Sequence, residues 1–366
     1  MKAVATLVLW ATFALSVVFG AITRRTHFCT MGAVADIVNM GDWARMRMWI
    51  MAMGVAIIGF NAMVSIGWLD AGKSIYGGPK FVWLSALVGG AMFGFGMVLA
   101  SGCGAKTLVR IGGGNLKSLV VFIVLGVSAF ATLKGVTAVA RVNTVDSIAI
   151  TFATGQDLPS LLAGGTGLAK TTLAAVLGLA LGGGLVVWTL ARPEGRTADN
   201  LLAGFGVGAV IVGVWWVSGR LGHVAEDPHT LQEAFAATNS QRMESVSFVA
   251  PVAYTLDWLM FFSDQSKRLT LGIVSVVGVV AGSAAHALLG RSFRWEGFRD
   301  ASDTANHLIG AALMGVGGVT ALGCTVGQGL SGLSTLSLTS FVAVAAIIAG
   351  AVAALRFQSW RIERSG

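Results

Sequence analysis

Long stretches of apolar residues, separated by short polar loops, occupy most of the chain. A helix needs ~20 apolar residues to cross a bilayer. The pattern predicts nine such spans, at residues 3–22, 47–67, 82–101, 118–138, 171–191, 201–217, 269–290, 305–322 and 337–356. The intervening stretch 219–267 is more polar, although Ser247–Phe262 is apolar enough to dip into the membrane. No strand-like alternation recurs, so the pattern predicts an all-α polytopic membrane protein and disfavours a β-barrel.

The composition agrees with this pattern. Hydrophobic residues make up 55% of the chain and charged residues 11%, with a mean hydropathy of +0.77. Soluble domains usually carry about 25% charged residues. The net charge of +8 does not indicate a nucleic-acid partner, because the Lys and Arg residues stand in short loops beside the apolar stretches. In that position they set the orientation of the chain in the lipid bilayer.

Basic residues are unevenly divided between the two sets of alternating loops. The richer set holds Arg24, Arg25, Arg45, Arg47, Lys106, Arg110, Lys117, Arg192, Arg196, Arg291, Arg294, Arg299, Arg356, Arg361 and Arg364. The richer side is predicted to be cytoplasmic. This places the N-terminus in the periplasm and the C-terminus in the cytoplasm of a multi-pass protein in the bacterial inner membrane. Because Arg24 and Arg25 directly follow the first span, we interpret that span as an uncleaved helix and not as a signal peptide.

The chain contains an internal repeat. Leu87–Cys103 aligns without gaps with Leu308–Cys324 at an offset of 221, and His27–Thr30 aligns with Ser247–Ala250 at an offset of 220. Gly89, Gly94, Gly96, Gly102 and Cys103 all find identical partners. The glycines favour close packing of helices.

The repeat predicts three parts. Residues 1–138 hold helices one to four, residues 139–200 form a connector with helix five, and residues 201–366 hold helices six to nine. A shift of five spans is odd, so the second half is expected to be inverted in the membrane relative to the first. Inverted repeats are typical of transporters, in which the substrate path lies where the halves meet.

All three cysteines follow an apolar span at a glycine-rich break. Three cysteines without a C-x-x-C spacing argue against a disulfide framework and against an ordinary zinc site. The breaks look like re-entrant turns, whose free backbone N–H groups at the start of a short helix can bind an anion. A neutral thiol adds a weak donor that can pass on a soft, sulfur-bearing anion without trapping it. The candidate path residues are Cys29, Cys103, Cys324, Gly102, Gly104, Gly323, Thr325, His27, Lys106, Arg110 and Gln328.

The same residues also have plainer explanations. Any single buried cysteine is readily explained as a small packing residue. The duplicated placement of Cys103 and Cys324 favours a function for those two, whereas the repeat pairs Cys29 only with Val249. His27 is as consistent with a packing role as with tuning the path.

Three motifs resemble a known family. HFCTMGA at 27–33, LASGCGAK at 99–106 and GCTVGQG at 323–329 are similar to the YeeE/YedE family of sulfur-compound transporters. The resemblance implies thiosulfate import through an hourglass-shaped path between inverted repeats. It implies that Cys103 is the central thiol, with Cys29 and Cys324 as relay positions on its cytoplasmic side. It also implies a small soluble sulfurtransferase-like partner in the cytoplasm.

Other functions stay open at this point. One is transport of a different sulfur or selenium species. A second is a membrane sulfurtransferase that carries a persulfide, which needs a thiolate activated by a base, and only Cys29 has a histidine beside it. A Cu(I) transporter and a purely structural subunit are less favoured. We expect no enzymatic activity, no cofactor and no bound metal.

Overall fold

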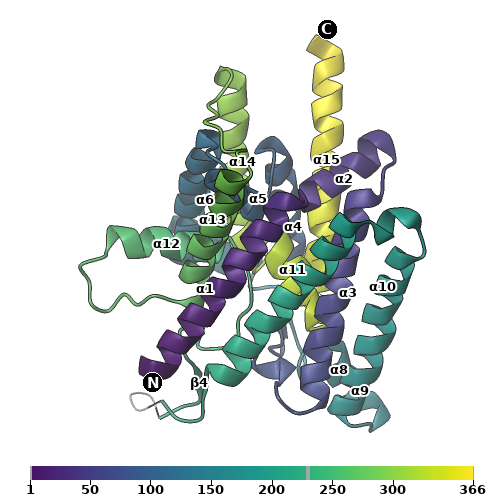
Figure 1. Ribbon diagram of the computed structural model, residues 1–366. Helices are drawn as coiled ribbons and strands as arrows, with labels where there is room; N and C mark the ends of the chain where they lie inside the picture. Colours follow the sequence, from purple (N-terminus) through teal and green to yellow (C-terminus); the bar gives the residue numbers. More distant parts are fainter. Residues whose placement is uncertain (1, 228–230, 366) are drawn as a thin grey trace.

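The computed structural model describes residues 2–227 and 231–365, and nearly all of its regular structure is helical (Figure 1). Residues 1 and 366, the outer bounds of the two predicted halves, lie outside the described part. The chain starts at one face of the helical bundle and ends at the opposite face (Figure 1), and we call these faces the N side and the C side. The long helices are α1 (Lys2–Arg25), α3 (Ala44–Ser65), α4 (Trp83–Leu99), α6 (Leu116–Lys134), α11 (Ala198–Trp216), α13 (Leu271–Leu289), α14 (Ala301–Thr320) and α15 (Leu338–Ser365).

Shorter elements link these helices. The short α-helices are α2 (Thr30–Met40), α5 (Gly104–Gly112), α7 (Val136–Asn143), α8 (Leu158–Thr166), α9 (Lys170–Leu177), α10 (Gly183–Leu190) and α12 (Ala250–Met260). The 3-10 helices are η1 (Ala71–Lys73) and η3 (Pro193–Arg196), and the π-helical turns are η2 (Gly178–Gly182), η4 (Val217–Leu221) and η5 (Gly327–Gly332). Two antiparallel pairs of two-residue strands complete the described part: β1 (Lys80–Phe81) with β2 (Ile150–Thr151), and β3 (His223–Val224) with β4 (Ala234–Phe235).

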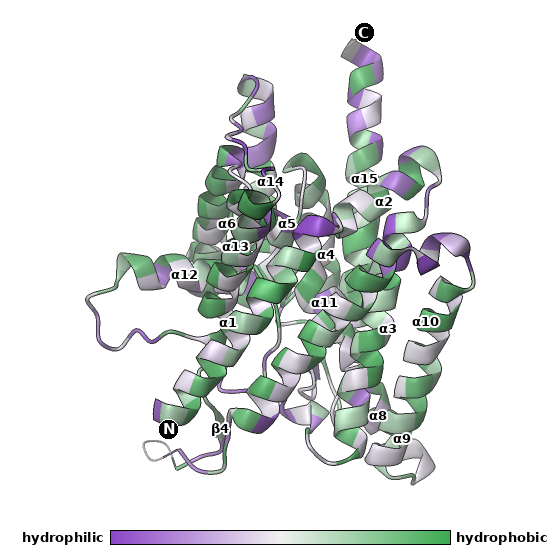
Figure 2. Cartoon of the chain, viewed as in Figure 1, coloured by the Kyte–Doolittle hydropathy of each residue, from purple (hydrophilic) through white to green (hydrophobic). Residues whose placement is uncertain are grey.

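Eight helical segments of the described chain are long and apolar enough to cross a bilayer. They are Lys2–Met40, Ala44–Ser65, Trp83–Gly112, Leu116–Lys134, Lys170–Leu190, Ala198–Leu221, Leu271–Leu289 and Leu338–Arg364. Figure 2 shows apolar residues along these helices and polar residues gathered near the helix ends and loops. The predicted class is confirmed: the chain is an all-α polytopic membrane protein.

Each of the nine predicted spans coincides with a helix. The predicted span 305–322 corresponds to α14, which is not among the eight apolar segments because Asp303, Asn306 and His307 stand in its first two turns. The predicted span 171–191 is a continuous run of α9, η2 and α10. Hydropathy did not anticipate α2, α7 and α8, which are too short to stand out as spans.

The centre of the bundle is a close crossing of α4 and α14. A Cβ atom on Gly96 would lie 2.6 Å from the carbonyl oxygen of Gly310, and one on Gly310 would lie 2.6 Å from that of Gly96. Gly89 and Gly317 face each other in the same way, at 2.7 and 2.6 Å. The two backbones therefore touch without intervening side chains, the arrangement that small residues permit between membrane helices.

The helices around this crossing form matched pairs. α4 packs on α15 and α14 packs on α6, while α1 packs on α13 and α3 packs on α11. On α4, Gly94 lies against the backbone of Ile347, and on α14 Gly315 lies against that of Leu125. The run from α7 to α10 leaves this central group, and α8, α9 and α10 lie at its edge beside α3 (Figure 1).

The crossing makes a testable prediction about stability. Gly96→Ala places a methyl group against the Gly310 carbonyl, and overpacking of this kind costs about 1–3 kcal/mol. We expect a lower midpoint in thermal unfolding of the detergent-solubilised protein. Gly184→Ala on α10 is the matched control, because nothing lies within 4 Å of its added Cβ. Equal midpoints for the two variants would contradict a tight α4–α14 contact.

Candidate substrate path

Each of the three cysteines stands immediately before the first turn of a helix. Cys29 is the N-cap of α2, and Cys103 is the N-cap of α5. Cys324 precedes a helical segment over residues 325–334 that has η5 at its centre. The first N–H groups of a helix have no partner within it and carry partial positive charge. Each of the three thiols therefore lies at the positively polarised start of a helix.

The sulfur atoms differ in how far they satisfy these N–H groups. The Cys29 sulfur accepts a hydrogen bond from the Gly32 N–H at 3.4 Å, and the Cys324 sulfur accepts one from the Gly327 N–H, also at 3.4 Å. The Cys103 side chain makes no capping bond of this geometry, although its sulfur lies near the Lys106 N–H. All three thiols thus lie at the first N–H groups of a helix.

The two turns that hold Cys103 and Cys324 have the same backbone shape. Ser101 and Leu322 both adopt a left-handed conformation, with φ of 56° and 58°. The Gly102 N–H donates to the Met97 carbonyl, and the Gly323 N–H donates to the Gly318 carbonyl, both at 2.8 Å. The equivalence predicted at an offset of 221 thus extends to the conformation of the turns.

These turns bring the thiols into one buried region. Exposure is 8% for Cys29, 2% for Cys103 and 0% for Cys324. The Cys103 sulfur lies within electrostatic reach of both other thiols and beside the Thr325 hydroxyl. That hydroxyl is buried, and the Cys103 sulfur is the polar atom beside it. No group of three or more His, Cys, Asp or Glu side chains in the described part is arranged to bind a metal ion. We call the three cysteines the row of thiols.

An extended segment that leads into α12 runs between the Cys103 and Cys324 turns. Within it, the Phe248 N–H and the Ser247 hydroxyl point at the Cys324 sulfur. The Phe248 carbonyl lies 3.3 Å from where a Cβ atom on Gly104 would stand. This segment aligns with the residues before Cys29, and Val249 is the N-cap of α12 just as Cys29 is the N-cap of α2. Hydropathy does not mark Ser247 as a candidate site residue. The only sequence signal for it is its alignment with His27 in the internal repeat.

A cationic cavity of about 510 Å³ opens on the C side. It is lined by His27, Ser101, Lys106 and Arg110, with further basic residues from neighbouring loops. Lys117 at its rim is neutralised by Asp303 at 3.0 Å and by Glu296 at 3.6 Å. Lys106 and Arg110 are half-buried and form no ion pair among the described residues. Their charges are thus available to an anion.

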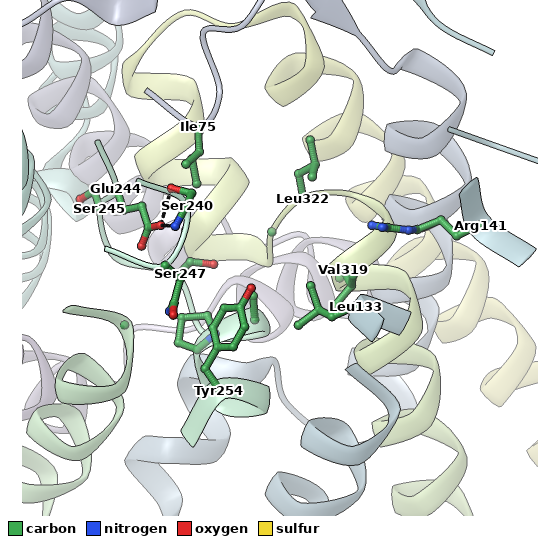
Figure 3. A pocket seen from close by; sticks show the side chains of 16 residues that line it. Ile75, Leu133, Arg141, Ser240, Glu244, Ser245, Ser247, Tyr254, Val319 and Leu322 are labelled. Carbon is green, nitrogen blue, oxygen red and sulfur yellow. Dashed lines mark hydrogen bonds between the residues drawn. The ribbon is translucent and has the colours of Figure 1, made fainter. Parts of the chain in front are cut away.

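A second cavity, of about 220 Å³, opens on the N side and is shown in Figure 3. Ser247, Leu322 and Gly323 line it and link it to the Cys324 turn. Arg141 reaches in from one side and Glu244 from the other (Figure 3). Arg141 lies 3.3 Å from Asp146, so its charge is partly offset. The row of thiols therefore lies between one cavity on each side of the bundle.

Comparison with known proteins agrees with this geometry. Residues 25–353 match the protein family described as sulphur transport. The chain belongs to this family. The thiosulfate transporter TsuA of Escherichia coli (strain K12) is 26% identical over 335 residues, which cover 90% of this chain and 89% of that protein. The thiosulfate transporter TsuA of Spirochaeta thermophila is 22% identical over 357 residues, which cover 93% and 96%.

A third relative matches a smaller region. The probable transporter YedE of Salmonella typhimurium is 34% identical over 92 residues, 25% of this chain and 21% of that protein. The resemblance to the YeeE/YedE family is thus confirmed. The chain is a membrane transporter of the sulphur-transport family.

Most of the residues predicted for the path lie together in this family member. Gly102, Gly104 and Gly323 flank the thiols in the turns, and His27, Lys106 and Arg110 line the C-side cavity. Gln328 is placed differently. Its amide nitrogen donates to the Ala321 carbonyl at 2.5 Å, and its amide oxygen accepts from the Ser340 hydroxyl at 2.6 Å. Its polar atoms thus brace the Cys324 turn.

Glu244, at the N-side cavity, should make stability depend on pH. Burial raises the pKa of its carboxyl group, although hydrogen bonds from Ser240 oppose the rise. The folded protein therefore holds this proton more tightly than the unfolded chain, whose glutamate pKa is about 4.3. The resulting stability is fully present below that value and is lost as pH rises through the folded pKa.

The prediction compares thermal midpoints of the parent and Glu244→Gln as pH rises from about 4 to 7. We expect the midpoint of the parent to fall relative to that of the variant. Glu233→Gln is an opposite-sign control, because hydrogen bonds from Lys73 and His223 lower the pKa of Glu233. There the parent should lose stability relative to the variant as pH falls. Parallel curves for the parent and Glu244→Gln would refute the effect of burial.

Proposed function

We propose that this protein imports thiosulfate across the bacterial inner membrane, along a path lined by Cys324, Cys103 and Cys29. The main support is the row of three thiols, each at a helix start, between cavities on opposite sides of the bundle. The substrate comes from the printed names of the two TsuA relatives. Another sulfur or selenium species of similar charge is the alternative substrate.

The site is suited to passing an anion on. Helix starts and uncapped N–H groups attract negative charge. Thiols are weak donors, and conduction needs sites that bind weakly enough to release. The unpaired charges of Lys106 and Arg110 add attraction on the C side only. No covalent step is needed, which supports transport without enzymatic chemistry.

The geometry supports an order of contact that differs from the one the family resemblance implied. That resemblance placed Cys324 on the cytoplasmic side of Cys103. Ser247 and Gly323 instead connect the Cys324 turn to the N-side cavity, while His27 and Lys106 connect the other two thiols to the C-side cavity. We propose that the anion meets Cys324 first, then Cys103 and Cys29.

The direction follows from orientation. We propose that the N side is periplasmic, because basic residues are concentrated at the C-side ends of the helices. We further propose that residues 1–138 and 201–366 are inverted repeats joined by a connector at 139–200. The matched helix pairs and the identical turns support this. A small soluble sulfurtransferase-like protein would receive the anion where the cationic cavity opens.

The first prediction from this proposal concerns Cys103. Replacing it with Ala removes the central donor to an anion, worth about 1.5–3 kcal/mol for a charged partner. We expect thiosulfate uptake to fall at least about tenfold in cells that lack their own sulfate and thiosulfate importers. Cys103→Ser keeps a donor and should retain part of the activity. Full uptake by Cys103→Ala at equal membrane abundance would exclude the thiol path.

A second prediction concerns the cationic cavity. Lys106→Met removes an unpaired charge beside Cys103 and should raise the KM for thiosulfate several-fold, because a half-buried cation attracts a dianion strongly. Lys80→Met is the matched control, since Lys80 is exposed in β1 on the N side. Uptake should be measured over a range of thiosulfate concentrations. An unchanged KM in Lys106→Met would show that this charge takes no part in binding.

A further inference from the structure

Tyr76 is one of only two tyrosines in the chain. Its side chain is 1% exposed, and its hydroxyl makes no hydrogen bond to any residue that the structure describes. Buried tyrosine hydroxyls usually find a partner, because burying an unpaired one is costly. A buried donor without an acceptor in the protein calls for an explanation.

The surroundings of Tyr76 fix where this hydroxyl points. The loop before it is tied to the loop before Ser247, because the Ile75 N–H donates to the Met243 carbonyl at 3.1 Å. The ring packs edge-on against Trp215, with 6.2 Å between ring centroids. Trp215 is itself fixed by a 3.0 Å hydrogen bond from its indole nitrogen to the Ser334 hydroxyl. The Tyr76 ring is thus held rigidly on the segment that follows Cys324.

The hydroxyl ends beside the Cys324 thiol. A Cβ atom on Gly327 would lie 3.5 Å from the Tyr76 hydroxyl and 2.5 Å from the Ser247 hydroxyl. Tyr76 also lies within electrostatic reach of Cys324, and the Ser247 hydroxyl points at the Cys324 sulfur. The Thr325 hydroxyl, on the residue directly after Cys324, lies beside the Cys103 sulfur instead. Two hydroxyl groups, those of Tyr76 and Ser247, therefore lie near the Cys324 thiol.

The equivalent positions at the Cys103 turn carry different chemistry. Ser247 aligns with His27, and Gly327 aligns with Lys106 at the same offset of 221 that relates the two cysteines. The Cys103 turn thus has an imidazole and an ammonium group beside it. The Cys324 turn has neutral hydroxyl groups, which occupy the space left free because Gly327 has no side chain. The Cys103 and Cys324 turns differ in charge and not in backbone shape.

We propose that Tyr76 and Ser247 form an oxyanion-recognition site beside Cys324, in which their hydroxyls donate to the oxygen atoms of the incoming sulfur oxyanion. This inference rests on the proposed function. Tyr76 is then a specificity-determining residue at the N-side end of the path. Its buried hydroxyl receives its acceptor only when substrate is present.

The chemistry of the substrate class suits such a site. Thiosulfate has a terminal sulfur and three oxygens, and the oxygens are the stronger hydrogen-bond acceptors. Neutral O–H donors in a buried site bind these oxygens without the deep electrostatic trap of a buried cation. The anion would then move from neutral donors near Cys324 to the cations near Cys103, where the electrostatic attraction on it is stronger.

Other buried hydroxyls without partners do not share this setting. Thr12 and Ser16 lie on α1, and Ser16 packs against Gly278 of α13. Both residues lie more than two helical turns before the end of α1, and Cys29 comes only after that end. They provide matched controls, because removing their hydroxyls also removes a buried unpartnered group.

The test compares thiosulfate uptake by the parent, Tyr76→Phe and Thr12→Val in cells without other thiosulfate importers. Both substitutions remove one buried hydroxyl and keep the shape of the side chain. Tyr76→Phe should raise the KM about tenfold, as loss of a hydrogen bond to a charged group does, with little change in maximal rate at equal abundance. Thr12→Val should keep the parent KM. Ser247→Ala should raise the KM in the same direction.

A second measurement uses the purified full chain in detergent. Thiosulfate should raise the thermal midpoint of the parent and of Thr12→Val, and a much higher concentration should be needed for Tyr76→Phe. If the parent takes up thiosulfate and Tyr76→Phe and Ser247→Ala keep its KM, the recognition site is overturned while the proposed function stands. If the parent takes up no thiosulfate, the proposed function fails, and this inference fails with it. If Tyr76→Phe does not fold, the KM of Ser247→Ala decides.

Discussion

Backbone N–H groups at the start of a helix have no partner within the helix, and inside a membrane there is no bulk water to supply one. This protein starts helices after Cys29, Cys103 and Cys324, with all three cysteines buried. The thiols of Cys29 and Cys324 accept hydrogen bonds from N–H groups of the helices that follow them. Such helix starts need an acceptor, and under the proposed function a passing anion would supply one.

These helix starts stay in place because of how α4 and α14 meet. Gly96 and Gly310 let the two backbones touch, and the helices end in turns of the same shape that direct Cys103 and Cys324 inwards. The contact depends on the absence of side chains at the crossing. A glycine-rich helix has low intrinsic stability, and here packing of one half against the other compensates for it.

The Cys103 and Cys324 turns share a backbone shape and differ in the side chains around them. At the Cys103 turn, His27 and Lys106 border a cationic cavity. At the Cys324 turn, Ser247 and Tyr76 occupy the space around Gly327. The two turns are equivalent in backbone, and the side chains at a few positions make the surroundings of one neutral and those of the other positive. Under the proposed function, this difference would give the path a direction in its electrostatic potential.

The sequence by itself determined the class of the protein, the nine helical spans and the equivalence of the Cys103 and Cys324 turns, because hydropathy and glycine spacing are local properties. It also singled out the three cysteines as candidates for the path. Only the tertiary structure decided which cavity each thiol approaches, that Gln328 braces a turn, and that Tyr76 from a distant loop ends beside Cys324. Those facts depend on which loops meet between the two halves, and residues far apart in the chain carry no local signal of such contacts.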